Sequence, residues 1–250
     1  MGGWLAVAGL GPGDERLVTP EAAAAIARAS DLVGYGPYVR RVAPRPGLRL
    51  HESGNGDEIA RARLALALAA EGRRVVVASS GDPGVFAMAA AVFEAIETGE
   101  PGWRGLDVRV LPGVTAMLAA AARAGAPLGH DFCALNLSDN LKPRALVERR
   151  LRLAVEADFA MALYNPRSKA RPDGFARALE ILRAVCEPGR VLIFARAVST
   201  PDEEIEVVAL SEARPEQADM RTIVLVGSSA TRVLAREGRP FVYTPRSAPA

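Results

Sequence analysis

Cysteine and histidine are scarce in this chain of 250 residues. It contains two cysteines, Cys133 and Cys186, and two histidines, His51 and His130. Two distant cysteines cannot form a disulfide framework or a zinc cluster, and two histidines are too few to favour a histidine-built metal site. We therefore expect no bound metal, and the low cysteine content is typical of a reducing cytoplasm.

Long apolar runs and an excess of charge of one sign are also missing. No uninterrupted apolar stretch approaches the length of a membrane-spanning helix, so we expect no membrane association. The 31 basic and 29 acidic residues leave a net charge of +2, which gives no reason to expect nucleic acid bound by bulk charge. Half of the residues are hydrophobic and 24% are charged, which is typical of a folded globular protein.

Common nucleotide and nucleophile motifs are absent as well. The chain has neither a Walker A sequence nor a G-x-S-x-G nucleophile elbow. The run Gly9-Leu-Gly-Pro-Gly-Asp14 resembles a dinucleotide-binding loop, but that loop requires G-x-G-x-x-G opening directly into a helix. Here Pro12 interrupts the pattern and the next expected helix begins several residues later, so dinucleotide binding is disfavoured.

What the sequence does contain is a regular alternation of strand-like and helix-like segments. Strands are expected at 4–8, 31–36, 74–78, 108–111, 132–137, 159–163, 190–195, 204–210 and 222–226. Helices are expected at 21–29, 57–70, 88–96, 115–123, 145–155 and 175–185, the first with Thr19 as N-cap and Pro20 at its first position. This alternation predicts an α/β fold with a largely parallel sheet covered by helices.

The character of the chain changes near residues 112–130. The first half holds the glycine-rich turns, and the second has more Arg and Asp in its loops, with signs of antiparallel strands at 204–226. We expect two α/β domains, an N-terminal one at 1–113 and a C-terminal one with a mixed sheet at 114–250. A cleft between two such domains is a natural place for a small molecule.

The most informative segment is 79–88, Ser-Ser-Gly-Asp-Pro-Gly-Val-Phe-Ala-Met, where a buried strand leads into a helix. Ligands of open α/β sheets bind at the carboxyl ends of strands. Gly81 and Gly84 permit close approach of the backbone to a ligand, and Asp82 can accept a hydrogen bond from a hydroxyl or ammonium group. The alternative is an ordinary loop in which Asp82 caps the following helix.

Cationic side chains cluster in several loops at expected strand ends. The clusters comprise Arg40, Arg41 and Arg45; Lys142 and Arg144; Arg167, Lys169 and Arg171; and Arg232. Arginine binds carboxylates with two parallel hydrogen bonds, so the distribution suits a ligand with several carboxylates. The alternative is a solvated surface in an arginine-rich protein.

Three turns together resemble those of a known family. Val7-Ala-Gly-Leu-Gly-Pro-Gly-Asp14, Ser80-Gly-Asp-Pro83 and Pro112-Gly-Val-Thr-Ala116 occur in the order and spacing of the tetrapyrrole methylases, the class III S-adenosylmethionine methyltransferases. The resemblance covers nearly the whole chain, from Trp4 to about Arg232.

Further motifs resemble one branch of that family, the methyltransferases that act on C17 of precorrin-3B. These motifs are Tyr35-Gly-Pro-Tyr38, Ser80 to Met88, Gly129-His-Asp-Phe132, Leu137-Ser-Asp-Asn-Leu141 and Tyr164-Asn-Pro-Arg-Ser-Lys169. Arg144 departs from the pattern, because that branch usually has an aromatic residue after the proline of the Leu-Ser-Asp loop.

The resemblance implies a binding site for S-adenosylmethionine in a cleft between the two α/β domains, held largely by backbone atoms. Its implied cofactor residues are Pro12, Gly81, Asp82, Val85, Thr115, Ala116, Asn165, Ala197 and Val226. The implied substrate is precorrin-3B, and its candidate contacts are Tyr35, Tyr38, Lys142, Arg144, Arg167 and Lys169.

The implied reaction is methylation of C17 with contraction of the macrocycle to precorrin-4, in cobalamin biosynthesis. The acid and base for ring contraction are not assigned, and Asp82, His130, Asp131 and Asp139 are the candidates. The resemblance also implies a homodimer. Two alternatives stay open: a methylase of the same superfamily acting on another ring carbon, and a non-catalytic tetrapyrrole-binding protein.

Overall fold

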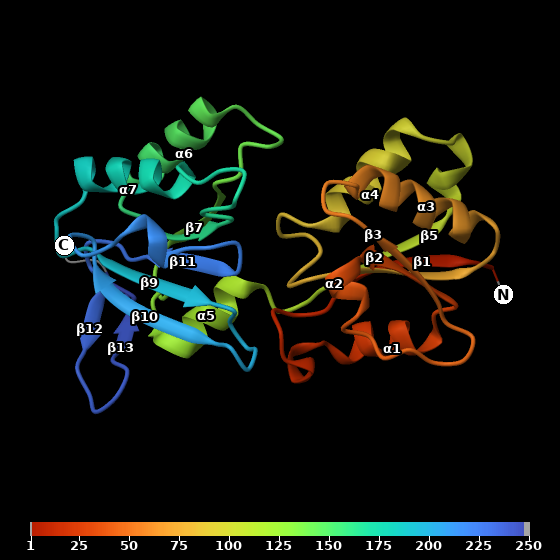
Figure 1. Cartoon of the computed structure of the whole chain (residues 1–250), viewed down its shortest axis with the longest axis horizontal. Helices are drawn as coiled ribbons and strands as arrows, with labels where there is room; N and C mark the ends of the chain where they lie inside the picture. Colours follow the sequence, from red (N-terminus) through yellow and green to blue (C-terminus); the bar gives the residue numbers. More distant parts are fainter. Residues whose placement is uncertain (1, 248–250) are drawn as a thin grey trace. The chain divides into compact units, whose positions relative to one another are not determined.

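Two compact units, Met1–Thr115 (unit 1) and Ala116–Ala250 (unit 2), make up the chain in a computed structural model that describes residues 2–247. In Figure 1 the colours of unit 1 run from red to yellow and those of unit 2 from green to blue. Each unit contains a sheet with helices packed on its faces, so the α/β class expected from the sequence is confirmed.

Unit 1 has a parallel sheet with the strand order β3-β2-β4-β1-β5. Its strands are β1 (Trp4–Gly9), β2 (Asp31–Tyr35), β3 (Arg49–Ser53), β4 (Arg74–Ser79) and β5 (Asp107–Leu111). The central strands β1 and β4 carry short apolar runs that are buried on both faces, as expected for strands of a parallel sheet covered by helices on both sides.

Helices cover both faces of this sheet. In Figure 1, α1 (Pro20–Arg28) lies on one face, and α3 (Glu58–Ala70) and α4 (Met88–Thr98) lie on the other. The short helix α2 (Gly36–Val39) packs on the α1 side, where Val39 is fully buried. Thr19 caps α1 as expected, since its Oγ1 accepts a hydrogen bond from the backbone N–H of Ala22 at 3.3 Å.

The sequence did not indicate β3. Its residues, Arg-Leu-His-Glu-Ser, are mostly exposed or half-buried at the edge of the sheet, so they lack the apolar alternation that marks a half-buried strand. Pairing with β2 forms this strand instead. Gly36, expected to end the second strand, begins α2.

Unit 2 has a mixed sheet with the strand order β10-β9-β11-β8-β7. Its strands are β7 (Phe132–Asn136), β8 (Ala160–Tyr164), β9 (Val191–Arg196), β10 (Glu204–Ala209) and β11 (Thr222–Val226). β7 and β8 are parallel, whereas β11 is antiparallel to β8 and β9, and β10 is antiparallel to β9. The antiparallel character expected at 204–226 is confirmed.

Helices α6 (Arg144–Glu156) and α7 (Gly174–Val185) pack on one face of this sheet and α5 (Ala116–Ala124) on the other (Figure 1). The core beneath α6 and α7 includes an edge-to-face pair of Phe175 and Phe194, with ring centres 5.7 Å apart. A small sheet of β12 (Arg232–Leu234), β13 (Phe241–Tyr243) and β6 (Gly125–Ala126) was not expected from the sequence. None of the helices within 2–247 is long and apolar enough to cross a membrane.

Candidate functional site

In unit 1 the predicted glycine-rich loops meet at the carboxyl ends of β1 and β4, which are neighbours in the sheet. The chain leaves β1 toward α1 on one face and leaves β4 toward α4 on the opposite face. Such a change of direction opens a crevice at the strand ends, where ligands of open α/β sheets bind. Gly11 and Gly81 join the two loops through mutual backbone hydrogen bonds of 3.2 and 2.9 Å.

A third loop, after β5, packs against the other two through glycine. A Cβ atom on Gly113 would lie 2.2 Å from the carbonyl oxygen of Gly81 and 2.9 Å from Cα of Gly9. A Cβ on Gly9 would lie 2.7 Å from Cα of Gly113. Only residues without a side chain allow three backbones to approach this closely. The glycines therefore determine the spacing of the three loops.

Asp82 ties these loops together. One carboxylate oxygen accepts a hydrogen bond from the N–H of Gly84 at 2.8 Å, and the other accepts one from the N–H of Gly113 at 3.0 Å. The N-cap of α4 is Ala87, so the alternative in which Asp82 caps that helix is wrong. A carboxylate has about four lone-pair sites, so the half-buried Asp82 retains capacity to accept a hydrogen bond from a ligand.

Two of the cations considered as ligand anchors, Arg41 and Arg45, have structural roles. The guanidinium of Arg41 donates to the carbonyl oxygens of Leu10, Gly11 and Gly13, which fixes the loop after β1. Arg45 donates to carbonyl oxygens at the end of α1, at 2.8 and 2.7 Å. Backbone carbonyls thus hold both guanidinium groups, and a role of these two arginines as ligand anchors stays a prediction.

In unit 2 the strands β7, β8 and β9 run in the same direction, so their carboxyl ends lie on the same side of the sheet, here called the carboxyl edge. Asn165 follows β8 and Ala197 follows β9 at this edge. The start of α5 is held there too, because the backbone N–H of Met117 donates to the hydroxyl oxygen of Tyr164 at 3.2 Å. The structure therefore brings together Ala116, Asn165 and Ala197, three of the implied cofactor residues.

Asn165 also organises this edge. Its side-chain amide donates to the side-chain oxygen of Asn136 at 3.1 Å, and that oxygen accepts a second bond from the N–H of Ser138 at 2.9 Å. The loops after β7 and β8 are joined in this way. Asn165 has a φ of 51°, a left-handed conformation that asparagine tolerates better than most residues.

The turn after β9 contains two further left-handed residues. Ala197 has a φ of 48° and Ser199 a φ of 63°, and such strained positions concentrate at functional sites. The Oγ of Ser199 is buried without a hydrogen-bond partner among the described residues. The sequence analysis missed Ser199, and no pattern of residue types indicates that conformation.

Val226 does not lie with Asn165 and Ala197, the other implied cofactor residues at the strand ends of unit 2. Its strand is antiparallel, so it pairs with Met161 and Leu192 near the amino ends of β8 and β9. Its side chain is 1% exposed and belongs to the core of unit 2. Val226 is therefore at the opposite end of the sheet from Asn165 and Ala197.

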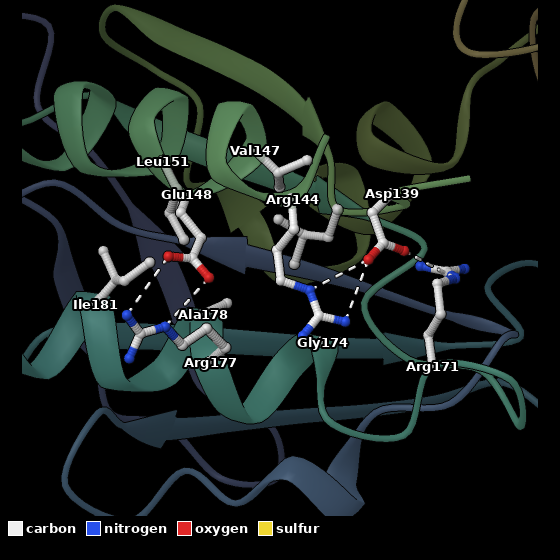
Figure 2. A pocket seen from close by; sticks show the side chains of 11 residues that line it. Asp139, Arg144, Val147, Glu148, Leu151, Arg171, Gly174, Arg177, Ala178 and Ile181 are labelled. Carbon is white, nitrogen blue, oxygen red and sulfur yellow. Dashed lines mark hydrogen bonds and ion pairs between the residues drawn. The ribbon is translucent and has the colours of Figure 1, made fainter. Parts of the chain in front are cut away.

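Asp139 and Arg144 form an ion pair in a small pocket between α6 and α7 (Figure 2). Arg144 donates to Asp139 at 3.2 Å, and Arg171 reaches the same carboxylate at 3.9 Å. The cavity measures about 20 Å³, which is room for roughly one water molecule. Arg144 is the first residue of α6, where a cation opposes the helix dipole and the carboxylate of Asp139 offsets that effect.

The remaining substrate candidates of unit 2 lie in the loops before α6 and α7. Burial and the nearby Arg150 lower the pKa of Lys142. Arg167 donates to the carbonyl oxygen of Pro172 at 3.2 Å, and Lys169 is exposed at the tip of the same loop. The structure places these residues on neighbouring loops after β7 and β8.

His130 and Asp131 lie just before β7, whereas Asp139 lies just after it. His130 and Asp131 are exposed, and His130 Nδ1 is 3.9 Å from the carboxylate of Asp131. The five residues of β7 span roughly 16 Å, so these candidates do not converge with Asp139. No cluster of three or more His, Cys, Asp or Glu suited to a metal occurs among residues 2–247.

Tyr35 and Tyr38 lie together where β2 passes into α2. Their rings make an edge-to-face contact with centres 5.2 Å apart. Burial, together with the neighbouring Tyr35, raises the pKa of Tyr38. Tyr35 borders an open groove of about 390 Å³ at the ends of β2 and β3.

Comparison with known proteins agrees with the fold and the loops. The sequence profile of the tetrapyrrole (corrin/porphyrin) methylases matches residues 5–214. A precorrin-3B C(17)-methyltransferase from Sinorhizobium sp is 53% identical over 98% of this chain and 97% of that protein. A probable cobalt-factor III C(17)-methyltransferase from Salmonella typhimurium is 37% identical over 97% of this chain and 98% of that protein.

A solved structure is similar throughout. The crystal structure of the methyltransferase CobJ superimposes with a TM-score of 0.93 and 66% identity, covering 97% of this chain and 100% of that one. The fold and its loops define an α/β methyltransferase. The chain belongs to the tetrapyrrole methylase family, and the family assignment made from its motifs is confirmed.

Proposed function

We propose that this protein methylates C17 of precorrin-3B, with S-adenosylmethionine as methyl donor and ring contraction to precorrin-4, in cobalamin biosynthesis. The observation that carries the proposal is the full-length, 53% identical relative with that named activity. The motifs at Tyr35–Tyr38, Ser80–Met88 and Tyr164–Lys169, which resemble the same branch of the family, support it.

Each unit by itself has residues suited to such a cofactor. In unit 1 the loops holding Pro12, Gly81 and Val85 follow β1 and β4, and Asp82 has a carboxylate that suits a sulfonium, ammonium or ribose hydroxyl. Thr115 ends unit 1, and Ala116, Asn165 and Ala197 supply the proposed contacts of unit 2. Val226 is not part of this proposed set, because it lies at the opposite end of its sheet.

The chemistry needs few side chains. The cofactor supplies an activated methyl group, and the protein must align it with the accepting carbon and exclude water. Such positioning can lower a barrier by roughly 7–11 kcal/mol. A methyl transfer of this kind requires no nucleophile–base pair. It requires fixed loops, and the glycine loops of unit 1 are held together by backbone hydrogen bonds and close backbone contacts.

The surroundings of the four candidates for the proton transfers of ring contraction differ. Asp139 is paired with Arg144, and His130 and Asp131 are exposed at the far end of β7. Asp82 lies in the proposed cofactor site, among the three glycine loops. We therefore propose Asp82 as the first candidate to test.

The function is tested by incubating purified protein with S-adenosylmethionine and precorrin-3B. The expected product is heavier by one methyl group, located at C17. Methylation of cobalt-factor III alone would favour the activity named for the 37% identical relative, and methylation at another carbon would favour a different branch. Binding of S-adenosylhomocysteine, measured by calorimetry, separates an enzyme from a non-catalytic tetrapyrrole-binding protein. The homodimer and the cytoplasmic location stay predictions.

Asp82→Asn is expected to weaken S-adenosylhomocysteine binding about tenfold. The amide keeps the shape of the side chain but turns an N–H donor toward the N–H of Gly84 or Gly113, so one loop contact becomes repulsive. Calorimetry measures the affinity, with Asp107→Asn as control, an exposed carboxylate of the same unit that pairs with Arg109. Equal affinity of Asp82→Asn and wild type would remove Asp82 from the cofactor site.

A further inference from the structure

A groove lies at the carboxyl ends of β2 and β3, and residues of two segments line it. Tyr35 and the first turn of α2 form one side, and Glu52, Ser53 and Gly54 form the other. The groove is open to solvent and measures about 390 Å³ within unit 1, which is large enough for a ligand side chain with part of a ring.

A single ion pair, Arg40 with Glu52, lies in this groove. Both side chains reach solvent, with exposed fractions of 61% and 41%. Gly36 makes room for the pair, since a Cβ there would lie 2.8 Å from the carboxylate of Glu52 and 2.9 Å from the guanidinium of Arg40. The guanidinium therefore lies directly against the backbone of α2.

Other arginines of unit 1 are held by the protein. Backbone carbonyls of the loop after β1 fix Arg41. Those at the end of α1 fix Arg45, which lies at the opposite end of β2 from the groove. Arg61 is only 5% exposed and donates to Ser53 Oγ at 2.8 Å and to the carbonyl oxygen of Gly54 at 2.7 Å, which stabilises the groove wall. Among the cations of residues 2–115, Arg40 is thus the one that lines this groove. Its side-chain partner is the exposed carboxylate of Glu52.

We propose that Arg40 binds a peripheral carboxylate of the substrate in exchange for Glu52. Glu52 holds the guanidinium through one contact, from Arg40 Nη1 to Glu52 Oε2. A guanidinium can form two parallel hydrogen bonds with one carboxylate, so a ligand carboxylate that uses both donors replaces Glu52. Tyr35 and Pro37 provide the adjoining surface of the groove. This inference rests on the proposed function, in which the substrate is a flat macrocycle with many carboxylates.

If a substrate carboxylate replaces Glu52 on Arg40, substitutions of Arg40 and of Glu52 should change the KM for the substrate in opposite directions. Arg40→Gln removes the binding cation and is expected to raise the KM for precorrin-3B about tenfold. Glu52→Gln removes the competing carboxylate and is expected to lower that KM about threefold. Neither variant should change kcat or the affinity for S-adenosylhomocysteine. Steady-state kinetics with both variants and the wild type provide the measurement.

Two variants serve as controls, Arg109→Gln and Asp107→Asn. Each removes one partner of another exposed ion pair in unit 1, that of Arg109 with Asp107. Neither control should alter the KM. A rise in KM for both Arg40→Gln and Glu52→Gln would show that the intact ion pair shapes the groove, and would overturn the exchange. An unchanged KM in Arg40→Gln would overturn it too. Absence of methylation by the wild type, despite S-adenosylhomocysteine binding, would instead contradict the proposed function.

Discussion

Replacing Gly113 by alanine is expected to weaken S-adenosylhomocysteine binding at least tenfold and to destabilise unit 1 by about 1–3 kcal/mol. The new Cβ would meet the carbonyl oxygen of Gly81 at 2.2 Å and Cα of Gly9 at 2.9 Å. Both obstacles are backbone atoms, so no rotamer change relieves the collision. The loops must separate, and the hydrogen bond from Gly113 to Asp82 is stretched or lost.

Gly102→Ala is the matched control. Gly102 lies in the turn Pro101–Gly105, and a Cβ there meets no atom within 4 Å. Calorimetry with S-adenosylhomocysteine and thermal unfolding should distinguish the two variants. Wild-type affinity in a folded Gly113→Ala protein would show that the spacing of the three loops does not determine cofactor binding.

Replacing Asp31 by asparagine is expected to destabilise the protein by about 3 kcal/mol, the lower end of the range for breaking a buried ion pair. The carboxylate is fully buried at the start of β2 and pairs with Arg49 at 3.0 Å, His51 at 2.9 Å and Arg73 at 3.3 Å. Arg49 and Arg73 reach solvent, which limits the loss. Urea denaturation measures the free energy of unfolding.

The same carboxylate makes stability depend on pH. Burial by itself would raise the pKa of Asp31, but hydrogen bonds from His51, Arg49 and Ser30 outweigh it and lower the pKa to about 2. A lowered pKa in the folded state stabilises the protein above the ordinary value of 3.8. This contribution, about 2 kcal/mol, is lost as the pH falls from about 4 toward 2.

The unfolding free energy of wild type should therefore fall more steeply below pH 4 than that of Asp31→Asn. Asp202→Asn, at an exposed ion pair with Arg221, should follow the wild type. Because Asp31 lies at the amino end of β2, away from the glycine loops, folded Asp31→Asn should keep its S-adenosylhomocysteine affinity. Parallel pH curves for wild type and Asp31→Asn would contradict the assigned role.

Most elements were predictable because their signals are local. Val75–Val77 in β4 and Ile223–Val226 in β11 are short apolar runs that can only be buried. Thr19 and Pro20 begin α1 through interactions within one turn. Strand β3 was not predictable in the same way, because its polar residues adopt that conformation through pairing with β2.

The candidate site was predictable in part. The positions of Gly81, Asp82 and Gly113 follow from turn chemistry at strand ends. The sequence indicates Gly81 and Asp82 as cofactor candidates, whereas the close packing of Gly113 follows only from the structure. Which backbone N–H groups Asp82 binds depends on the order of β4, β1 and β5 in the sheet. The placement of Val226 required the direction of β11, which is a property of the assembled sheet.

The amino-acid order alone determined the α/β class, the positions of the glycine turns and the family, because each depends on neighbouring residues or on motif spacing. Tertiary structure decided which cations are available to a ligand. Arg40, Arg41 and Arg45 look alike in the sequence, yet packing directs the latter two onto backbone carbonyls and leaves Arg40 beside Glu52 in a groove. The reason is physical: the partner of a long side chain is set by segments distant in sequence, and only folding brings those segments together.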